Sequence, residues 1–93
     1  MSVSIKKRTD YVFQVTVADS MTTTHEVTVT DQSLCDLTDD KVTKEQLIKF
    51  SFNFLLDREP NTSILSKFDI NVISKYFSDY RDEVKRWCNE SQN

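Results

Sequence analysis

The sequence predicts an α+β fold in which an antiparallel β-hairpin packs against three to four helices. Residues 11–17 and 25–30 alternate apolar and polar side chains, which is the pattern of half-buried strands. Residues 43–59 instead place their apolar side chains at helical spacing, behind a capping sequence. Because a lone hairpin is marginally stable in water, the helices are expected to cover one of its faces.

The hairpin is expected over about residues 11–30. The odd-numbered side chains from Tyr11 to Val17 share one face of the first strand, and the pattern extends this strand back through Thr9 and Ile5. A third strand joined to the hairpin is left open. His25, Val27 and Val29 share one face of the second strand, and the polar stretch 19–24 supplies the turn.

The helical part is expected over about residues 31–88. Asp31 is a candidate cap for a short first helix, and the spacing of Thr43 and Gln46 is that of a capping box. The helix from Thr43 must end by Glu59, because Pro60 disfavours helical geometry in the preceding residue.

Beyond Pro60 the apolar residues Ile64, Leu65 and Phe68 suggest a short helical link over residues 64–68. Asp69 is expected to cap a further helix, Ser78-Asp79 to interrupt it, and a last helix to follow from Tyr80. The polar residues 89–93 are expected to form a frayed tail.

The length of 93 residues predicts one domain, since two halves would each be too small to bury a core. The chain holds no glycine, which excludes the glycine-rich loops that cradle phosphate groups. Turns that need a positive φ must therefore use Asp or Asn, and the candidates are Asp19, Asp39, Asp40 and Asn61.

The cysteines and the lack of a targeting or membrane-spanning segment predict a cytoplasmic protein. Cys35 and Cys88 are far apart and lack a metal-binding or redox spacing, so they are interpreted as reduced thiols. No targeting segment and no apolar run of membrane-spanning length is present, and membrane partners are not expected. The net charge of −3 does not favour a polyanion as partner.

The segment 54–65, Phe-Leu-Leu-Asp-Arg-Glu-Pro-Asn-Thr-Ser-Ile-Leu, resembles a family of short bacterial proteins of unknown function, and so do the apolar positions that follow it between 68 and 77. The resemblance covers about residues 11–80 and implies a hairpin, a short turn and then helices, with no activity attached. The chain departs from the family at Asp39-Asp40, where a Gly pair is expected, and at Ser78, where a Pro is expected.

No catalytic, cofactor-binding or metal-binding residues are predicted. His25 is the only histidine and lies on the apolar face of its strand, so a packed side chain is favoured over a catalytic one. One histidine and two isolated cysteines do not make a zinc site with the usual spacings. An enzyme or small-molecule binder would need a pocket that holds His25 or the trio at 57–59.

Asp57, Arg58 and Glu59 are interpreted as a structural brace at the end of the main helix. Arginine pairs readily with carboxylates, and Pro60 makes the corner rigid. The alternatives are that Arg58 faces the carbonyl end of the helix or that the trio holds a charged group of a partner.

Tyr80, Trp87 and Arg86 are the predicted partner surface. Eight aromatic residues follow residue 49, more than three short helices and a hairpin easily enclose, and Tyr and Trp are enriched in binding hot spots. The leading hypothesis is therefore a non-enzymatic interaction or accessory module that binds another protein or itself.

The alternative hypothesis is a small nucleic-acid-binding regulator. Its basic clusters would be Lys6-Lys-Arg8 and Lys85-Arg86, and a helix-turn-helix would offer Asn71, Ser74 and Lys75 as readers. Both clusters are short and neighbour acidic residues, so a solvated surface is favoured over a nucleic-acid stripe.

Overall fold

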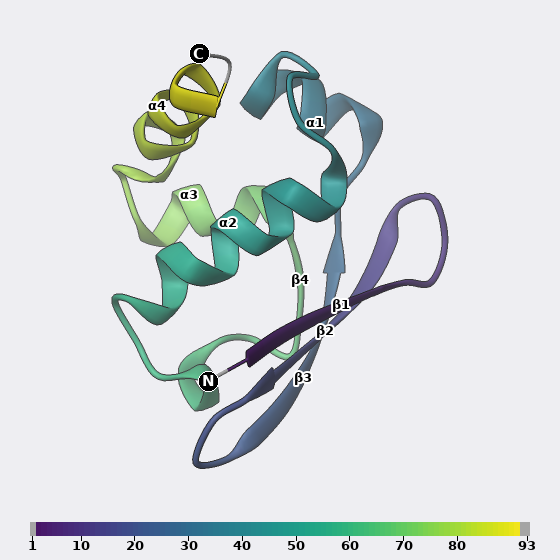
Figure 1. The fold of residues 1–93 in the computed structure, drawn as a ribbon, viewed down its shortest axis with the longest axis vertical. Coiled ribbons are helices and arrows are strands. Elements are labelled where there is room, and N and C mark those ends of the chain that lie inside the picture. The colour runs from purple at the N-terminus through teal and green to yellow at the C-terminus, as the bar shows by residue number, and fades with distance from the viewer. Residues whose placement is uncertain (1, 92–93) are drawn as a thin grey trace.

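The structure is a computed structural model that describes residues 2–91 (Figure 1), and it confirms the α+β class. The strands are β1 (Ser2–Lys7), β2 (Val12–Ala18), β3 (Thr22–Thr28) and β4 (Lys67–Asp69). The α-helices are α1 (Asp31–Thr38), α2 (Lys44–Leu56), α3 (Ile73–Tyr76) and α4 (Tyr80–Ser91), with 3-10 turns η1 (Asn61–Ser63) and η2 (Ile70–Val72).

The sheet has the order β1-β2-β3-β4, and its first three strands form an antiparallel meander. The predicted extension of one strand from residue 11 back through Ile5 is wrong, because the chain turns at residues 8–11 and Ile5 lies in a separate strand, β1, which is the third strand of the meander. The fourth strand corrects the prediction of a helical link at 64–68: β4 pairs in parallel with β3 and sets Phe68 beside Val27. A strand of 3 residues is too short to display a strand period, and its partner strand lies far earlier in the chain.

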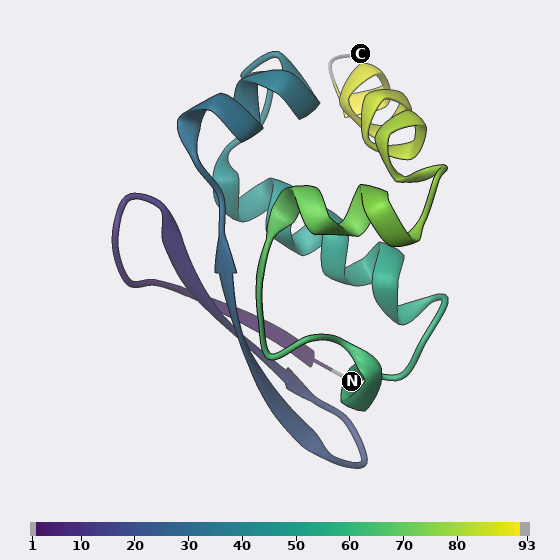
Figure 2. The same cartoon turned by 180° about the vertical axis from the view of Figure 1, so that it is seen from behind.

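One face of the sheet is apolar and the other is polar. Phe13, Val15 and Val17 of β2 are buried, and Val27 of β3 joins them. All the helices lie on this apolar side (Figure 1 and Figure 2). The opposite face carries half-exposed and exposed side chains that include Thr16 and Thr24, which are cross-strand neighbours.

Helix α2 crosses the apolar face and buries Leu47, Ile48, Phe52 and Leu55. Its predicted capping box is present: the Thr43 hydroxyl accepts from the amide of Gln46 at 3.1 Å, and the Gln46 side chain accepts from the Thr43 amide at 2.8 Å. The helix ends at Leu56, within the limit set by Pro60.

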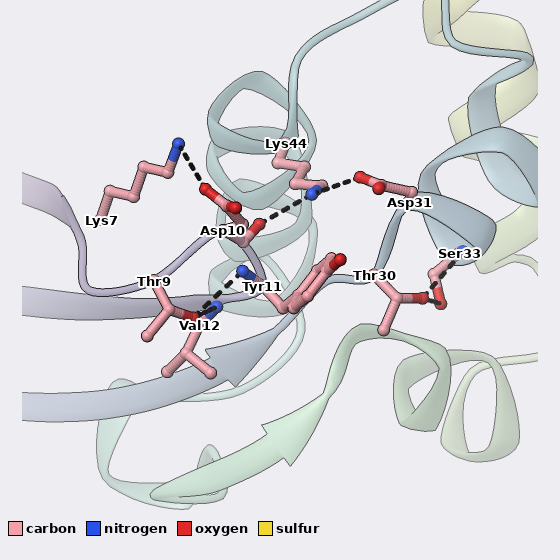
Figure 3. A network of polar contacts seen from close by, with 9 residues as sticks. All are labelled: Lys7, Thr9, Asp10, Tyr11, Val12, Thr30, Asp31, Ser33 and Lys44. Carbon is pink, nitrogen blue, oxygen red and sulfur yellow. Dashed lines mark hydrogen bonds and ion pairs between the residues drawn. The ribbon is translucent and has the colours of Figure 1, made fainter.

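The cap of α1 is one residue earlier than predicted. Thr30, in extended geometry, accepts from the Ser33 amide at 3.1 Å, and Asp31 is the first helical residue. Figure 3 shows what Asp31 does instead: it pairs at 2.6 Å with Lys44, whose ammonium also donates to the Asp10 carbonyl at 2.7 Å. These two contacts of Lys44 hold the starts of α1 and α2 against the turn between β1 and β2.

Two of the four candidates for positive φ adopt it. Asp39 and Asp40 follow α1 with φ of 53° and 59° and replace the glycine that usually ends a helix in this way. Asp19 and Asn61 do not have positive φ. Asn61 is instead buried at the start of η1, where its side-chain amide serves as a donor.

The C-terminal helices follow the predicted breaks but end later. The Asp69 carboxylate caps η2 by accepting from the Asn71 amide at 2.9 Å, and the chain is interrupted before α4 begins at Tyr80. Helix α4 continues to Ser91, so the expected frayed tail is helical from Asn89 to Ser91, and residues 92 and 93 lie outside the described residues. Within residues 2–91 no helix has the length and hydropathy to cross a bilayer.

Candidate protein-binding groove

An apolar groove of about 400 Å³ lies between the C-terminal end of α2, the segment from η1 to β4, and α3. These elements are the green part of the ribbon in Figure 2 and the adjoining end of α2. Leu55, Ile64, Phe68 and Ile73 are the buried members of its lining. The other lining residues are Glu59, Ser63, Leu65, Val72, Tyr76 and Phe77. We refer to this site as the α3 groove.

Two large apolar side chains of the α3 groove are exposed to solvent. Leu65 is 49% exposed and Tyr76 is 70% exposed, and they stand on different walls, one before β4 and one at the end of α3. Among the large apolar residues of positions 2–91, the only other exposed side chains are Tyr11 and Met21. Exposed apolar side chains gathered at a hollow are typical of a protein-binding surface.

Leu65 is held in place by a buried polar network that starts at His25. The His25 Nδ1 donates to the Leu65 carbonyl at 2.8 Å, because a carbonyl can only accept. The Nε2 lies 2.8 Å from the Thr23 hydroxyl, and the oxygen of that hydroxyl accepts from the Asn61 amide at 3.0 Å. The ring is 2% exposed. His25 is therefore a packed histidine, as predicted, and its contact orients one wall of the groove.

Asn61 ties the same wall to the β2–β3 hairpin. Its side-chain amide donates to the Met21 carbonyl at 2.9 Å in addition to the Thr23 hydroxyl. The wall is fastened again at Ser66, whose carbonyl accepts from the Glu26 amide at 2.7 Å. Hydrogen bonds thus hold the wall at both ends.

Arg58 fastens the opposite end of the groove, where α2 finishes. Its guanidinium pairs with Asp79 at 2.8 Å, donates to the Phe54 carbonyl at 3.1 Å and lies 3.6 Å from the centre of the Phe54 ring. The predicted brace named Asp57 and Glu59 as its carboxylates, and the structure corrects this. Arg58 turns back along α2 and reaches the turn before α4, so Asp79 is its partner.

Glu59 is left without such a partner. It lines the α3 groove, is half-buried, and has neither an ion pair nor a side-chain hydrogen bond within residues 2–91. Asp57, its neighbour in the predicted trio, is exposed. The α3 groove therefore combines an apolar lining with one carboxylate that has no ion-pair partner within residues 2–91.

The predicted partner surface at Tyr80, Trp87 and Arg86 is not one surface. Tyr80 is 0% exposed, because the first turn of α4 packs against α2 and the Tyr80 hydroxyl lies 2.6 Å from that of Ser51. Burial raises the pKa of Tyr80. A side chain that solvent does not reach cannot bind a partner, so this part of the prediction is wrong.

Trp87 and Arg86 are accessible to different degrees. Trp87 is half-buried and stacks on Phe50, with ring centres 4.5 Å apart and planes at 13°. The two rings and Ile5 border a shallow hollow of about 410 Å³ beside β1. Arg86 is exposed and pairs with Glu83 at 3.2 Å.

Two of the three residues proposed as nucleic-acid readers, Asn71 and Ser74, are engaged within the chain, whereas Lys75 is exposed. Asn71 donates to the Ser33 hydroxyl at 2.7 Å, and Ser74 donates to the Asn71 carbonyl at 2.8 Å. Helix α3 has 4 residues, about one turn, so it is too short for the recognition helix of a helix-turn-helix. In the first basic cluster, Lys7 pairs with Asp10 at 3.5 Å.

The structure does not unite the candidate chemical groups in one pocket. His25 borders a polar hollow with Arg8 and Gln14, whereas Glu59 borders the apolar α3 groove. Within residues 2–91 no group of three or more His, Cys, Asp or Glu side chains is placed to hold a metal ion.

The sequence prediction missed Leu65 and Tyr76 as exposed residues. A usable signal was present for Leu65, because Ile64-Leu65 is a pair of consecutive apolar residues in a segment outside the helices. Adjacent side chains of extended backbone point to opposite sides, so one of this pair is directed away from the core. Tyr76 is the last residue of α3, and no such local signal marked it.

Comparison with known proteins gave no match: no family model, no curated protein and no solved structure is significantly similar to the chain. The resemblance to a bacterial family at residues 54–65 stays a prediction.

Proposed function

We propose that the protein is a non-enzymatic protein-binding module whose α3 groove receives an apolar side chain of a partner, next to a lysine or arginine of that partner. The observation that carries the proposal is the exposure of Leu65 and Tyr76 on two walls of one apolar groove. Burying both side chains on binding would remove apolar surface from water, which is the main driving force of association.

Glu59 supports the choice of a basic neighbour for the apolar anchor. Its carboxylate is partly withdrawn from solvent beside apolar side chains and has no cationic partner within residues 2–91. A lysine or arginine of a bound segment would neutralise it in a site where water is excluded, and a carboxylate in that position would be repelled.

The rigidity of the walls supports binding rather than simple exposure. The His25 and Asn61 hydrogen bonds fix the wall that carries Leu65, and Arg58 fixes the end of α2. A site that is already ordered loses less conformational entropy when a partner binds.

The reducing cytoplasm is part of the same proposal. Cys35 and Cys88 are both free, and Cys88 is buried. The charge of Asp40 raises the pKa of the Cys35 thiol, and burial raises the pKa of the Cys88 thiol, so both effects disfavour the reactive thiolate. Cell fractionation with thiol trapping tests this compartment, and recovery of a disulfide-linked form from an oxidising compartment would contradict it.

Selection from a random peptide library displayed on phage tests the groove. We expect wild-type protein to enrich peptides in which an aromatic residue or leucine stands beside Lys or Arg. Synthetic copies of these peptides should bind Tyr76→Ala and Leu65→Ala at least about tenfold more weakly, the scale of a hot-spot loss.

The control is Met21→Ala, which removes an apolar side chain that is 64% exposed but does not line the groove. It should leave binding unchanged. Glu59→Gln should weaken the binding of peptides that carry the basic residue. It should leave unchanged the binding of matched peptides in which that residue is alanine. Enrichment of no sequence, or peptides that bind Tyr76→Ala as tightly as wild type, would refute the proposal.

A further inference from the structure

The outer edge of β1 is a row of backbone groups without partners among residues 2–91. Strand β1 lies at one end of the sheet and pairs only with β2. Bonds in an antiparallel ladder alternate, so every second residue of an edge strand directs its N–H and C=O groups away from its neighbour. Two hydrogen bonds outside the strands identify these residues.

The first bond runs from the Arg8 amide to the Val12 carbonyl at 2.9 Å. The register pairs Ser4 with Thr16, four residues further along each strand, so this pair is hydrogen-bonded in the same way. Even-numbered residues of β1 therefore bond to β2. The second bond, from the Val29 amide to the Tyr11 carbonyl at 2.7 Å, shows that odd-numbered residues of β2 bond to β3 and leave the even ones for β1. Both observations direct the N–H and C=O groups of residues 3 and 5 to the free edge.

We propose that this edge pairs with the β1 edge of a second copy of the chain, and that the protein forms a two-fold symmetric dimer with a continuous sheet. An antiparallel arrangement with Ser4 opposite Ser4 of the other copy sets Val3 opposite Ile5, and Ile5 opposite Val3. Both of these pairs direct their backbone groups at each other, so each exchanges two hydrogen bonds. The edge is self-complementary in this register.

Charge and shape favour the same arrangement. The register sets Lys6 opposite Ser2, so the basic end of each strand stays away from that of the other copy. A parallel pairing would bring the lysines together, which is unfavourable. On the helix side, the hollow bordered by Ile5, Phe50 and Trp87 leaves room for the apolar β1 side chains of the second copy.

The helix above the edge adds a second complementary feature. Glu45 and Lys49 are exposed on α2, one turn apart, and both border the hollow beside β1. A two-fold axis at Ser4 makes the two copies of α2 antiparallel, and antiparallel copies of a Glu-Lys pair offer opposite charges to each other. The dimer is independent of the α3 groove, which lies at other elements.

Sedimentation equilibrium over a wide range of protein concentrations tests the dimer, with Ser4→Lys as the decisive variant. Ser4 is exposed on the polar face, so a lysine fits the monomer, but in the dimer two lysines would face each other at the two-fold axis. We expect the dissociation constant to rise at least about tenfold. Thr24→Lys adds the same charge to the same face on β3 and should leave dimerisation unchanged. A wild-type protein that is monomeric at every concentration, or a dimer that Ser4→Lys does not weaken, would overturn the proposal.

Disulfide trapping tests the register. Directly opposite residues in a pair without hydrogen bonds have Cα atoms about 4.5 Å apart, within the range of a disulfide. In a Cys35→Ser background, Ser4→Cys should therefore cross-link rapidly under mild oxidation. Ser2→Cys is the control, because its symmetry mate lies about four residues along the strand, roughly 13 Å away. Equal cross-linking of the two variants would overturn the register. Tyr76→Ala, which tests the groove, should not change either result.

Discussion

The hydroxyl groups of Tyr80 and Ser51 lie 2.6 Å apart in the core, and Tyr80 is the donor of the bond between them. Ser51 has one hydroxyl hydrogen, which it gives to the Leu47 carbonyl at 2.7 Å. Its oxygen can therefore only accept from Tyr80. This bond joins the first turn of α4 to the middle of α2 and satisfies the one polar atom that the buried tyrosine ring carries.

Tyr80→Phe is expected to lower the free energy of unfolding by about 1 kcal/mol, because a buried hydrogen bond is lost while the ring packing is kept. Urea denaturation followed by circular dichroism measures the difference. Tyr76→Phe, which removes a hydroxyl from a side chain that is 70% exposed, should change stability little. An unchanged Tyr80→Phe protein would contradict the assigned bond.

The same tyrosine predicts an alkaline loss of stability. Burial raises the pKa of Tyr80 above its ordinary value of 10, so the folded state holds a proton that the unfolded state releases. The resulting stability is fully present below pH 10 and is lost progressively as the pH rises above it. Unfolding measured on both sides of that pH should show this loss in wild type, and Tyr80→Phe should lack the contribution. Identical profiles for the two proteins would contradict the raised pKa.

Asn61→Ala is expected to destabilise the fold by about 2 kcal/mol. The substitution removes a buried donor from the Met21 carbonyl and the Thr23 hydroxyl, and leaves both groups to find other partners. Thermal and urea unfolding measure the effect. Thr62→Ala, at the exposed next position of η1, is the matched control and should stay near wild type. A similar loss of stability in both variants would contradict the stabilising role of the Asn61 side-chain amide.

Arg58→Lys is expected to cost about 1 kcal/mol, although it keeps the charge. The flat guanidinium donates to the Phe54 carbonyl and to Asp79 together while it covers the Phe54 ring, and a lysine ammonium cannot do all three. Asp79→Asn should cost less, because both side chains of the ion pair are partly exposed. A double-mutant cycle separates the pair from the stacking, and a larger loss in Asp79→Asn than in Arg58→Lys would contradict this ranking.

The sequence was informative at several positions where the signal is local. The strand alternation from Phe13 to Val17, the capping box at Thr43 and the stop before Pro60 each depend on neighbours within a few residues, and each appears in the structure. Tyr11, predicted on the same face, instead precedes β2 and is exposed. The positive φ of the Asp pair at 39–40 was predicted for the same reason. The absence of glycine narrowed the candidates to a few side chains that tolerate this geometry.

Long-range contacts were beyond the reach of such signals. Strand β4 is defined by its pairing with β3, which sets Phe68 beside Val27. The ion-pair partner of Arg58 is Asp79, 21 positions away. The burial of Tyr80 depends on how α4 packs against α2, which a charged helix pattern does not specify. The α3 groove was missed on the same ground, since its walls come from α2, η1, β4 and α3.

The polar face of the sheet provides positions at which a label can be attached for binding measurements. Thr16 and Thr24 lie opposite the helices and outside both the α3 groove and the β1 edge. A fluorophore, a spin label or an attachment to a sensor surface placed at Thr24 would report on binding without blocking it. The molecule thus has a site for labelling on one side and its proposed contacts on the others.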